Sequence, residues 1–409
     1  MPSIRPTTTP LLTRLSRAAA GLRRGWPALP AIAAALALSL ISIYAVDLAE
    51  SLTPHGWGEL SAGALRQAMY LAVAVAASII TLLPHYRWLG YASWSLLGIA
   101  VLLLIFLLIP GVPTSIVRPR NGARAWIDLG AMDFQPSEVA KIAYVLVLAW
   151  YLRFRRNHRT FVGLIPPAII TFIPVGLILL QPDLGTAILF IPALFAVLTA
   201  AGAKIQHLVL IVLCAALAAP AAYPLLKPHQ KQRIQGLVLQ LKGDTSADQD
   251  INMQSVTSQR LIGAGGASGL GDTHARTLLH YNALPERRTD MIFAVIAARF
   301  GLWGGIGVLG LYALWIIGAL GTGAACREPF GRLVCVGLTG FIAAQVFINI
   351  GMNLGLLPII GITLPFLSYG GSSLLTVWIM TGLVANIALR RPRVSARRSF
   401  EYEDDAARE

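Results

Sequence analysis

Long apolar runs follow one another along most of this 409-residue chain, and they limit its fold more than any other feature. A helix of about 20 apolar residues crosses the roughly 30 Å of hydrocarbon in a bilayer, and most of the runs have about that length. With 56% hydrophobic and only 13% charged residues, the composition excludes a soluble domain of this size. We predict an all-α, polytopic membrane protein with about ten transmembrane helices, near residues 30–49, 66–83, 89–110, 136–153, 162–180, 184–200, 206–226, 291–320, 332–356 and 369–389.

The distribution of basic residues predicts the orientation of these spans. An even number of spans puts both ends of the chain on one side. If that side is the cytoplasm, 19 basic residues lie in cytoplasmic segments and only Arg66, Arg118, Arg120 and Arg124 in the short outer loops. Lys and Arg are retained in short cytoplasmic loops, whereas loops longer than about 60 residues escape this rule. Both termini are therefore expected in the cytoplasm, and the large loop 227–290 outside, between the seventh and eighth helices.

The same reasoning divides the chain into a cytoplasmic N-terminal tail, 1–29, a ten-helix membrane domain, 30–390, and a cytoplasmic C-terminal tail, 391–409. No convincing small-residue cleavage site follows the first apolar run, so we expect an uncleaved span. The net charge of +14 is explained by basic residues that flank the spans and hold loops in the cytoplasm. The sequence has no basic face interleaved with aromatic residues, so a nucleic-acid partner is not indicated. The three cysteines, two of them in apolar runs, argue against a disulfide framework.

Polar clusters mark the outer ends of four spans, whereas the spans that begin on the cytoplasmic side lack them. Proline or an acid in the first turn is an ordinary helix-start signal, which explains any one cluster but poorly explains a one-sided set of four. Four helix N-termini at one region would aim free N–H groups and positive dipole ends at it, which suits a phosphate-bearing ligand. The clusters are Gln135-Pro136-Ser137-Glu138, Gln181-Pro182-Asp183, Arg288-Thr289-Asp290 and Ser368-Tyr369-Gly370-Gly371-Ser372-Ser373.

Asp290 places a carboxylate at the mouth of a membrane helix. Such a position is costly, so the residue is a candidate for function by default. Glu286, Arg287 and Arg288 precede it, and a polar loop leads into it from the aqueous side. A general base has to reach its proton and have a route to solvent. A substrate with its tail in lipid and its head in water would meet Asp290 at this depth, which makes Asp290 a candidate catalytic base.

Other polar residues have both a structural and a functional interpretation. Glu138 and Lys141 lie three residues apart on one helix face, where they neutralise each other in lipid, line a polar cavity, or do both. Asp183 either caps its helix or contributes to the outer region. Arg124, beside Trp126, either contacts a phosphate or belongs to an interfacial anchor.

Arg299 lies nine residues after Asp290, and nine steps of about 100° place it on the opposite helix face. We therefore expect it outside the site of Asp290, with a partner that the sequence does not identify. The glycine-rich run 263–271 lacks the strand and the Gly-Lys-Ser/Thr of a nucleotide loop, so a flexible or closely packed loop is expected. The histidines have no metal-ligand spacing, which argues against a zinc site.

The polar clusters belong to longer motifs that follow one another in order. They are Arg124-Ala-Trp-Ile-Asp-Leu-Gly130, Phe134-Gln-Pro-Ser-Glu-Val-Ala-Lys141, Gln181-Pro-Asp-Leu-Gly-Thr186, Leu284-Pro-Glu-Arg-Arg-Thr-Asp290, Asn349-Ile-Gly-Met352 and Leu364-Pro-Phe-Leu-Ser-Tyr-Gly-Gly-Ser-Ser373. Together they resemble the signature of the shape, elongation, division and sporulation (SEDS) family, over roughly residues 30 to 390. The resemblance implies ten transmembrane helices and a glycosyltransferase that polymerises lipid II at the outer face of the bacterial cytoplasmic membrane.

The resemblance also assigns site residues and partners. It makes Asp290 the essential carboxylate and places Glu138, Lys141 and Asp183 at other functionally important positions. The remaining substrate-binding or supporting candidates are Arg124, Gln181, Glu286, Ser368 and Ser372. The implied partners are lipid II, membrane lipid and a class B penicillin-binding protein, with undecaprenyl pyrophosphate released. The resemblance identifies no certain cofactor and leaves a divalent cation, Mg²⁺ or Mn²⁺, open.

Two motifs, 126–130 and 349–352, resemble the elongation branch of the family, RodA, more than the division branch, FtsW. Two positions depart from the family: Arg288 stands where His is usual, and Ala298-Arg299-Phe300-Gly301 stands where Glu-Glu-Leu-Gly is frequent. The departures remove acids from the eighth span and leave Asp290 intact.

Two other functions are alternatives to glycosyl transfer. One is a transporter of lipid-linked precursors, which would place its site near the midplane between internal repeats. The other is a scaffold without enzymatic activity.

Overall fold

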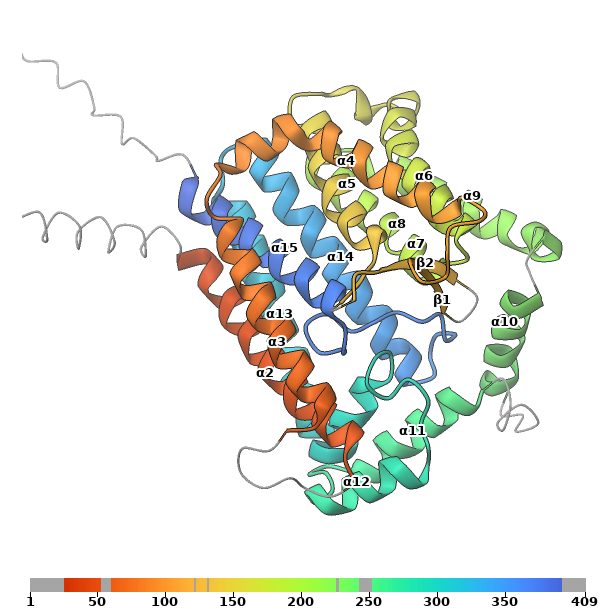
Figure 1. Cartoon of the computed structure of the whole chain (residues 1–409). Helices are drawn as coiled ribbons and strands as arrows, with labels where there is room; N and C mark the ends of the chain where they lie inside the picture. Colours follow the sequence, from red (N-terminus) through yellow and green to blue (C-terminus); the bar gives the residue numbers. More distant parts are fainter. Residues whose placement is uncertain are drawn as a thin grey trace, which may run out of the picture.

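The computed structural model describes residues 26–52, 60–120, 123–130, 132–225, 228–242 and 252–391. The two predicted tails lie almost entirely outside these residues. Helices occupy all ten predicted spans (Figure 1). They are α2 (Leu29–Glu50), α3 (Ala62–Ile80), α4 (Tyr86–Leu108), α5 (Pro136–Leu152), α6 (Ile165–Leu180), α7 (Leu184–Ile188) followed by α8 (Phe190–Ala201), α9 (Ile205–Ala222), α13 (Ile292–Ala325), α14 (Pro329–Asn353) and α15 (Gly371–Arg390).

Eight spans within the described residues are long and apolar enough to cross a membrane. The other two are α5, which is 17 residues long, and α9, whose apolar part covers Ile205–Leu217. The prediction of an all-helical polytopic membrane protein is therefore confirmed. Before α2, the short helix η1 (Trp26–Ala28) contacts α15, so the described chain begins and ends at the same end of the bundle (Figure 1).

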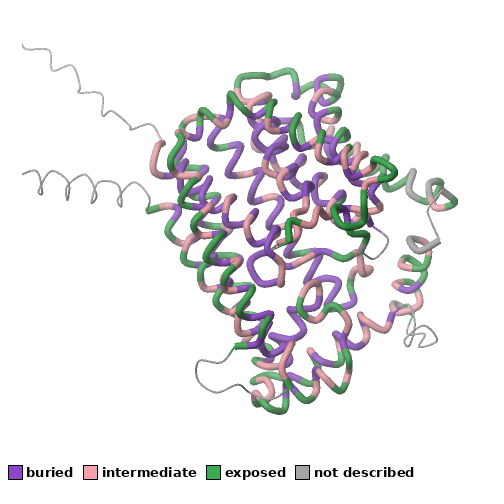
Figure 2. Tube along the Cα trace, viewed as in Figure 1, coloured by how far each residue is buried: buried purple, intermediate pink, exposed green. Residues whose placement is uncertain are grey.

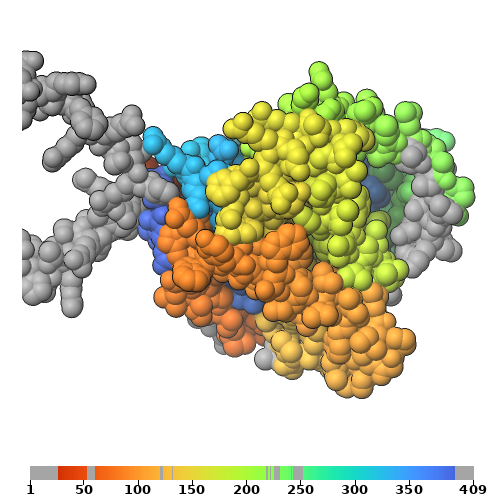
Figure 3. Space-filling model, turned by 90° about the horizontal axis from the view of Figure 1, so that it is seen from above, coloured from red at the N-terminus to blue at the C-terminus, as the bar shows by residue number. Residues whose placement is uncertain are grey.

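The large segment after α9 contains three helices in the part that the structure describes, which the sequence did not predict. It contains α10 (Pro228–Leu241), α11 (Met253–Gly265) and α12 (Asp272–Tyr281). We call α11 and α12 together the cap, because they lie across one end of the bundle, at the bottom of Figure 1. Figure 3 shows the opposite end, where the segment around residue 150 lies in the centre. We refer to the two ends as the cap end and the far end.

A small antiparallel sheet joins α4 to α5 and was also not predicted. Its order is β1-β2-β3, and its strands are β1 (Val117–Arg120), β2 (Ala123–Asp128) and β3 (Asp133–Phe134). These strands are too short for an alternating pattern to stand out in the sequence. The sheet brings β2 and β3 close to the start of α5 at the cap end.

Small residues allow the central helices to approach closely. A Cβ at Gly318 of α13 would lie 2.7 Å from the backbone nitrogen of Ala31 in α2. A Cβ at Gly382 of α15 would lie 2.6 Å from the carbonyl of Ser78 in α3. Lipid offers little hydrophobic drive for helix association, so close van der Waals packing at such positions replaces it. Buried residues accordingly gather along the inner helices, with exposed ones on the outer faces (Figure 2).

Gly301 bends α13 with φ 64° and ψ −157°, a backbone conformation that favours glycine. The bend separates a first arm, residues 292–300, from the long remainder of the helix. The glycine-rich run packs against it: the Leu302 N–H donates to the Gly266 carbonyl at 2.9 Å, and the Leu270 N–H to the Ala298 carbonyl at 3.0 Å. The expected loop covers only residues 266–271 of the run and packs against the bend, whereas residues 263–265 form the end of α11.

Candidate active site

Hydrogen bonds join the four polar helix starts into one patch at the cap end. Between the starts of α5 and α7, Gln135 Nε2 donates to Asp183 Oδ2 at 3.1 Å. The Gln135 N–H donates to Ser372 Oγ of α15, also at 3.1 Å. Ser368 Oγ donates to the carbonyl of Thr289, just before α13, at 2.7 Å. The structure thus brings the four clusters to the common region that their one-sided placement predicts.

The backbone of Asp290 is held from α14. The side-chain amides of Asn349 and Asn353 both donate to the Asp290 carbonyl, at 2.8 and 3.0 Å. These two residues are four apart, so they share one helix face. Asn349 also donates to the Ile362 carbonyl, at 2.6 Å, and thereby fixes the loop that passes Asp290. The backbone is anchored in this way, while no described residue donates a hydrogen bond to the Asp290 carboxylate.

The surroundings of the Asp290 carboxylate favour its protonated form. Asp290 precedes the span that begins at Ile292. Burial raises the pKa of Asp290 to about 7, and the negative charges of Glu286 and Asp183 act in the same direction. Arg233 of α10 opposes them. A carboxylate with this pKa holds a proton roughly a thousandfold more tightly than an ordinary Asp, and is still substantially ionised at neutral pH.

Glu286 lies in a strained turn beside a cleft. Its φ is 51° and that of Ala283 is 44°, both in the left-handed region that costs a non-glycine residue about 1–2 kcal/mol. Thr289 Oγ1 donates to Glu286 Oε2 at 2.6 Å. The adjacent cleft, of about 580 Å³, is lined by residues 283, 284 and 286–289, by His280 and by the end of α2. The cleft reaches Thr289 and stops one residue short of Asp290.

Asp183 has both of the roles that its sequence context allowed. One carboxylate oxygen accepts the Thr186 N–H at 3.0 Å and caps α7, while the other accepts from Gln135.

Four further candidates have other contacts. Lys141 Nζ and Glu138 Oε1 form a buried ion pair of 2.8 Å within α5, and Glu138 Oε2 has no partner among the described residues. Gln181 donates to the Leu104 carbonyl at 2.8 Å, so it binds α4. Arg124 lies on β2, and its buried Nε likewise lacks a partner among the described residues.

Sequence reasoning missed three residues of this region. Gln67, fully buried in α3, donates to the Ser368 carbonyl at 3.2 Å and accepts the Gly370 N–H at 3.3 Å. Asn353 holds the Asp290 carbonyl, and Arg233 contributes the opposing charge. Amides inside apolar spans were an available signal for Gln67 and Asn353. Arg233 gave none, because its role depends on how α10 folds back.

The described residues contain no group of three or more His, Cys, Asp or Glu that could hold a metal ion. All three cysteines are free.

Comparison with known proteins places this geometry in a family. The model of the FtsW/RodA/SpoVE cell cycle proteins matches residues 27–392, which is nearly all of the described chain. The chain belongs to the FtsW/RodA/SpoVE family. This is the SEDS family to which the sequence motifs point.

Relatives from several branches of the FtsW/RodA/SpoVE family share about a third of their residues with this chain. Stage V sporulation protein E of Bacillus subtilis is 34% identical over 330 residues, 80% of this chain and 86% of the relative. A probable peptidoglycan glycosyltransferase FtsW of Xanthomonas oryzae is 33% identical, covering 82% of this chain and 68% of the relative. The peptidoglycan glycosyltransferase MrdB of Escherichia coli is 37% identical, covering 67% and 73%.

Solved structures of family members share the fold. A chain from a study of polymerization and crosslinking by a peptidoglycan synthase complex is 31% identical, with a TM-score of 0.73, over 87% of this chain and 96% of its own. The crystal structure of Thermus thermophilus RodA is 28% identical, with a TM-score of 0.64, over 88% and 96%.

The two departures from the family pattern have structural partners in this chain. Arg288 Nη1 lies 3.0 Å from Glu50 Oε1 at the end of α2, and its guanidinium lies over the Tyr369 ring, 5.5 Å from the centroid. Arg299 donates to Tyr44 of α2 and to the carbonyl of Leu270, just before α12.

Proposed function

We propose that this protein is a peptidoglycan glycosyltransferase that polymerises lipid II into glycan strands. The convergence of four polar helix starts around Asp290 at one end of the bundle carries the proposal. Family relatives named peptidoglycan glycosyltransferases support it. A site at the bundle end, close to both lipid and water, suits a lipid-linked sugar better than the midplane site typical of transporters.

In the proposed reaction, Asp290 acts as general base. It accepts the proton of the acceptor sugar's 4-hydroxyl while that oxygen attacks the anomeric carbon of the donor. The new C–O bond forms as the bond from the anomeric carbon to the pyrophosphate oxygen breaks, and undecaprenyl pyrophosphate leaves. A pKa of about 7 suits this task, because the base is then both available and strong enough at neutral pH.

The leaving group carries negative charge, which groups at the cap end can stabilise. The starts of α5, α7, α13 and α15 direct backbone N–H groups and positive dipole ends towards the patch. Arg233, whose charge acts on Asp290, and Arg124 are the side chains we assign to the pyrophosphate. A bound divalent cation would add charge stabilisation there. Glu286, Ser368 and Ser372 are assigned to the sugar side, because they adjoin Asp290 or bond to its neighbours.

The buried Glu138–Lys141 pair is assigned a supporting role. It lies three to six residues into α5, after the Gln135 contact with Asp183. A buried pair of this kind fixes the helix start firmly, since removing one partner would leave an unpaired charge. Gln181 supports the other side through its bond to α4.

The proposed location is the cytoplasmic membrane, with both termini in the cytoplasm and the cap end outside. The excess of basic residues in the far-end loops supports this orientation. A class B penicillin-binding protein is the proposed partner. The support is that a structural relative comes from a peptidoglycan synthase complex that polymerises and crosslinks.

Within the family we favour the elongation branch, RodA. The motifs at 126–130 and 349–352 support this assignment. Expression in cells depleted of either their elongation or their division enzyme tests it: rescue of rod shape, without rescue of division, is expected. Rescue of division alone would assign the chain to the FtsW branch.

The decisive experiment compares wild type with Asp290→Asn in purified protein supplied with labelled lipid II and a cognate transpeptidase. We expect glycan polymer from the wild type and none above background from the variant. The substitution keeps size and polarity, so the Asn349 and Asn353 bonds to the backbone persist. Wild-type-like polymer from the variant would exclude Asp290 as base, and lipid II flipping without polymer from the wild type would favour a transporter.

A further inference from the structure

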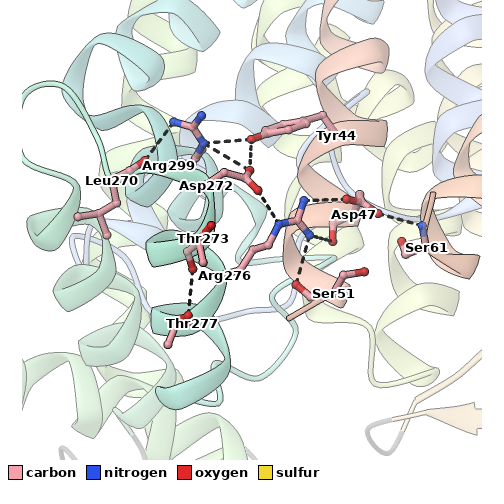
Figure 4. Close-up of polar contacts among 10 residues, drawn as sticks. All are labelled: Tyr44, Asp47, Ser51, Ser61, Leu270, Asp272, Thr273, Arg276, Thr277 and Arg299. Atoms are coloured by element: carbon pink, nitrogen blue, oxygen red, sulfur yellow. Dashed lines mark hydrogen bonds and ion pairs between the residues drawn. The ribbon is translucent and has the colours of Figure 1, made fainter. Parts of the chain in front are cut away.

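A polar network ties the cap to α2 and to the bend of α13 (Figure 4). Arg299, at the end of the first arm, donates from Nε to Tyr44 Oη and from Nη1 to the Leu270 carbonyl, both at 3.0 Å. Its Nε also lies 3.7 Å from Asp272 Oδ1. Arg299 is therefore the group where α2, α12 and the glycine-rich run meet.

A second arginine extends the network. Arg276 of α12 is buried, and it pairs with Asp272 at 2.9 Å and with Asp47 of α2 at 2.8 Å. Tyr44 Oη donates to Asp272 Oδ1 at 2.7 Å. Burial alone would raise the pKa of Asp272, but hydrogen bonds from Tyr44 and Arg276 hold it below its ordinary value. Two cations thus face two carboxylates, and the network stays ionised at neutral pH.

The first arm connects this network to Asp290. Asp290 lies two residues before α13, and from Ile292 to Arg299 the helix rises by about 10 Å. The side chains of residues 292–298 are all buried, so the arm is confined on every side. Asn349 and Asn353 hold its Asp290 end, and Arg299 holds the other. A short helix confined in this way moves as one body, so loosening the Arg299 end displaces Asp290.

We propose that Arg299 is a positioning residue for the Asp290 carboxylate, acting through the first arm of α13. The inference rests on the proposed function. It also gives the departure from Glu-Glu-Leu-Gly a physical reason. In this chain an acid at position 299 would face Asp272 with like charge and would lose the donors to Tyr44 and Leu270.

Arg299→Gln in the full-length protein with its transpeptidase tests the proposal. We expect kcat to fall about tenfold or more, since displacements near 1 Å in an active site can cost about a hundredfold, with KM little changed. Arg299→Lys keeps the charge but not the two-point contact, so intermediate activity is expected. The matched control is Arg87→Gln, which breaks an arginine–carboxylate pair of 2.8 Å with Glu328 at the far end. The control should retain wild-type kcat.

Hydrogen exchange supplies a readout that does not need catalysis. Arg299→Gln should speed exchange of the backbone amides of residues 266–270 and 290–294, and leave those of α14 unchanged. If exchange at 290–294 matches wild type, or if kcat does, the inference is wrong while the proposed function stands. If the wild type makes no polymer, the proposed function fails instead, and the exchange result alone decides whether Arg299 positions this segment.

Discussion

Asp290 shows how single charges tune a base. Besides burial, three charges act on its pKa: those of Glu286 and Asp183 raise it, and that of Arg233 lowers it. Because the ionised carboxylate is the active form of a base, kcat/KM should rise with pH through about 7. Glu286→Gln removes a negative charge, so it should move this rise to lower pH, by roughly half a unit.

Arg233→Gln gives the matched opposite change in the same assay. It removes the positive charge that lowers the Asp290 pKa, so the rise in kcat/KM should move to higher pH. Shifts of equal sign in the two variants, or no shift in either, would mean that the titrating group is not Asp290.

At the scale of elements, the glycine-rich run and the bend of α13 form one joint. Gly269 has a φ of 82°, and a Cβ there would lie 2.2 Å from the Arg299 carbonyl. Gly269→Ala should therefore destabilise the protein by about 2 kcal/mol or more, through left-handed strain and overlap. The midpoint of thermal unfolding in detergent measures this loss.

Gly263→Ala is the control within the same run. Gly263 is exposed in α11, and a Cβ there meets nothing within 4 Å. Alanine at this position should be neutral, or stabilising by up to about 1 kcal/mol, because it favours helix. Equal losses of stability in the two variants would mean that the close approach at Gly269 is not what the run provides.

The joint also shows what the sequence can and cannot predict about elements. Spans are predictable because the hydrocarbon sets their length, and each predicted span has its helix. The helices of the cap are short and weakly apolar. Their formation therefore depends on packing against the bundle rather than on the pattern of their own residues. Tyr44 and Asp272 are partners of Arg299, and both lie far from it in the sequence, so no local pattern predicts these contacts. The four polar starts were visible because they lie at the ends of predictable helices.

For the whole molecule, we predict that the cap lies on the outer side of the membrane. Two large, exposed aromatic residues mark the two ends: Tyr281, 87% exposed, is the last residue of α12, and Phe154, 74% exposed, follows α5. Cysteine at either position is reachable by a thiol reagent that cannot cross the membrane. Cys326 and Cys335 are buried, so replacing the exposed Cys214 with serine should remove most background labelling by the reagent.

In cells with a permeable outer envelope and an intact cytoplasmic membrane, Tyr281→Cys should be labelled at once and Phe154→Cys only after lysis. The expected result follows from the basic residues, which gather in the far-end loops and hold them in the cytoplasm. The reverse pattern would place Asp290 on the cytoplasmic side, where a polymerase would extend glycan strands inside the cell. A site at the cap end can build the wall only if the Tyr281 cysteine is the one that reacts.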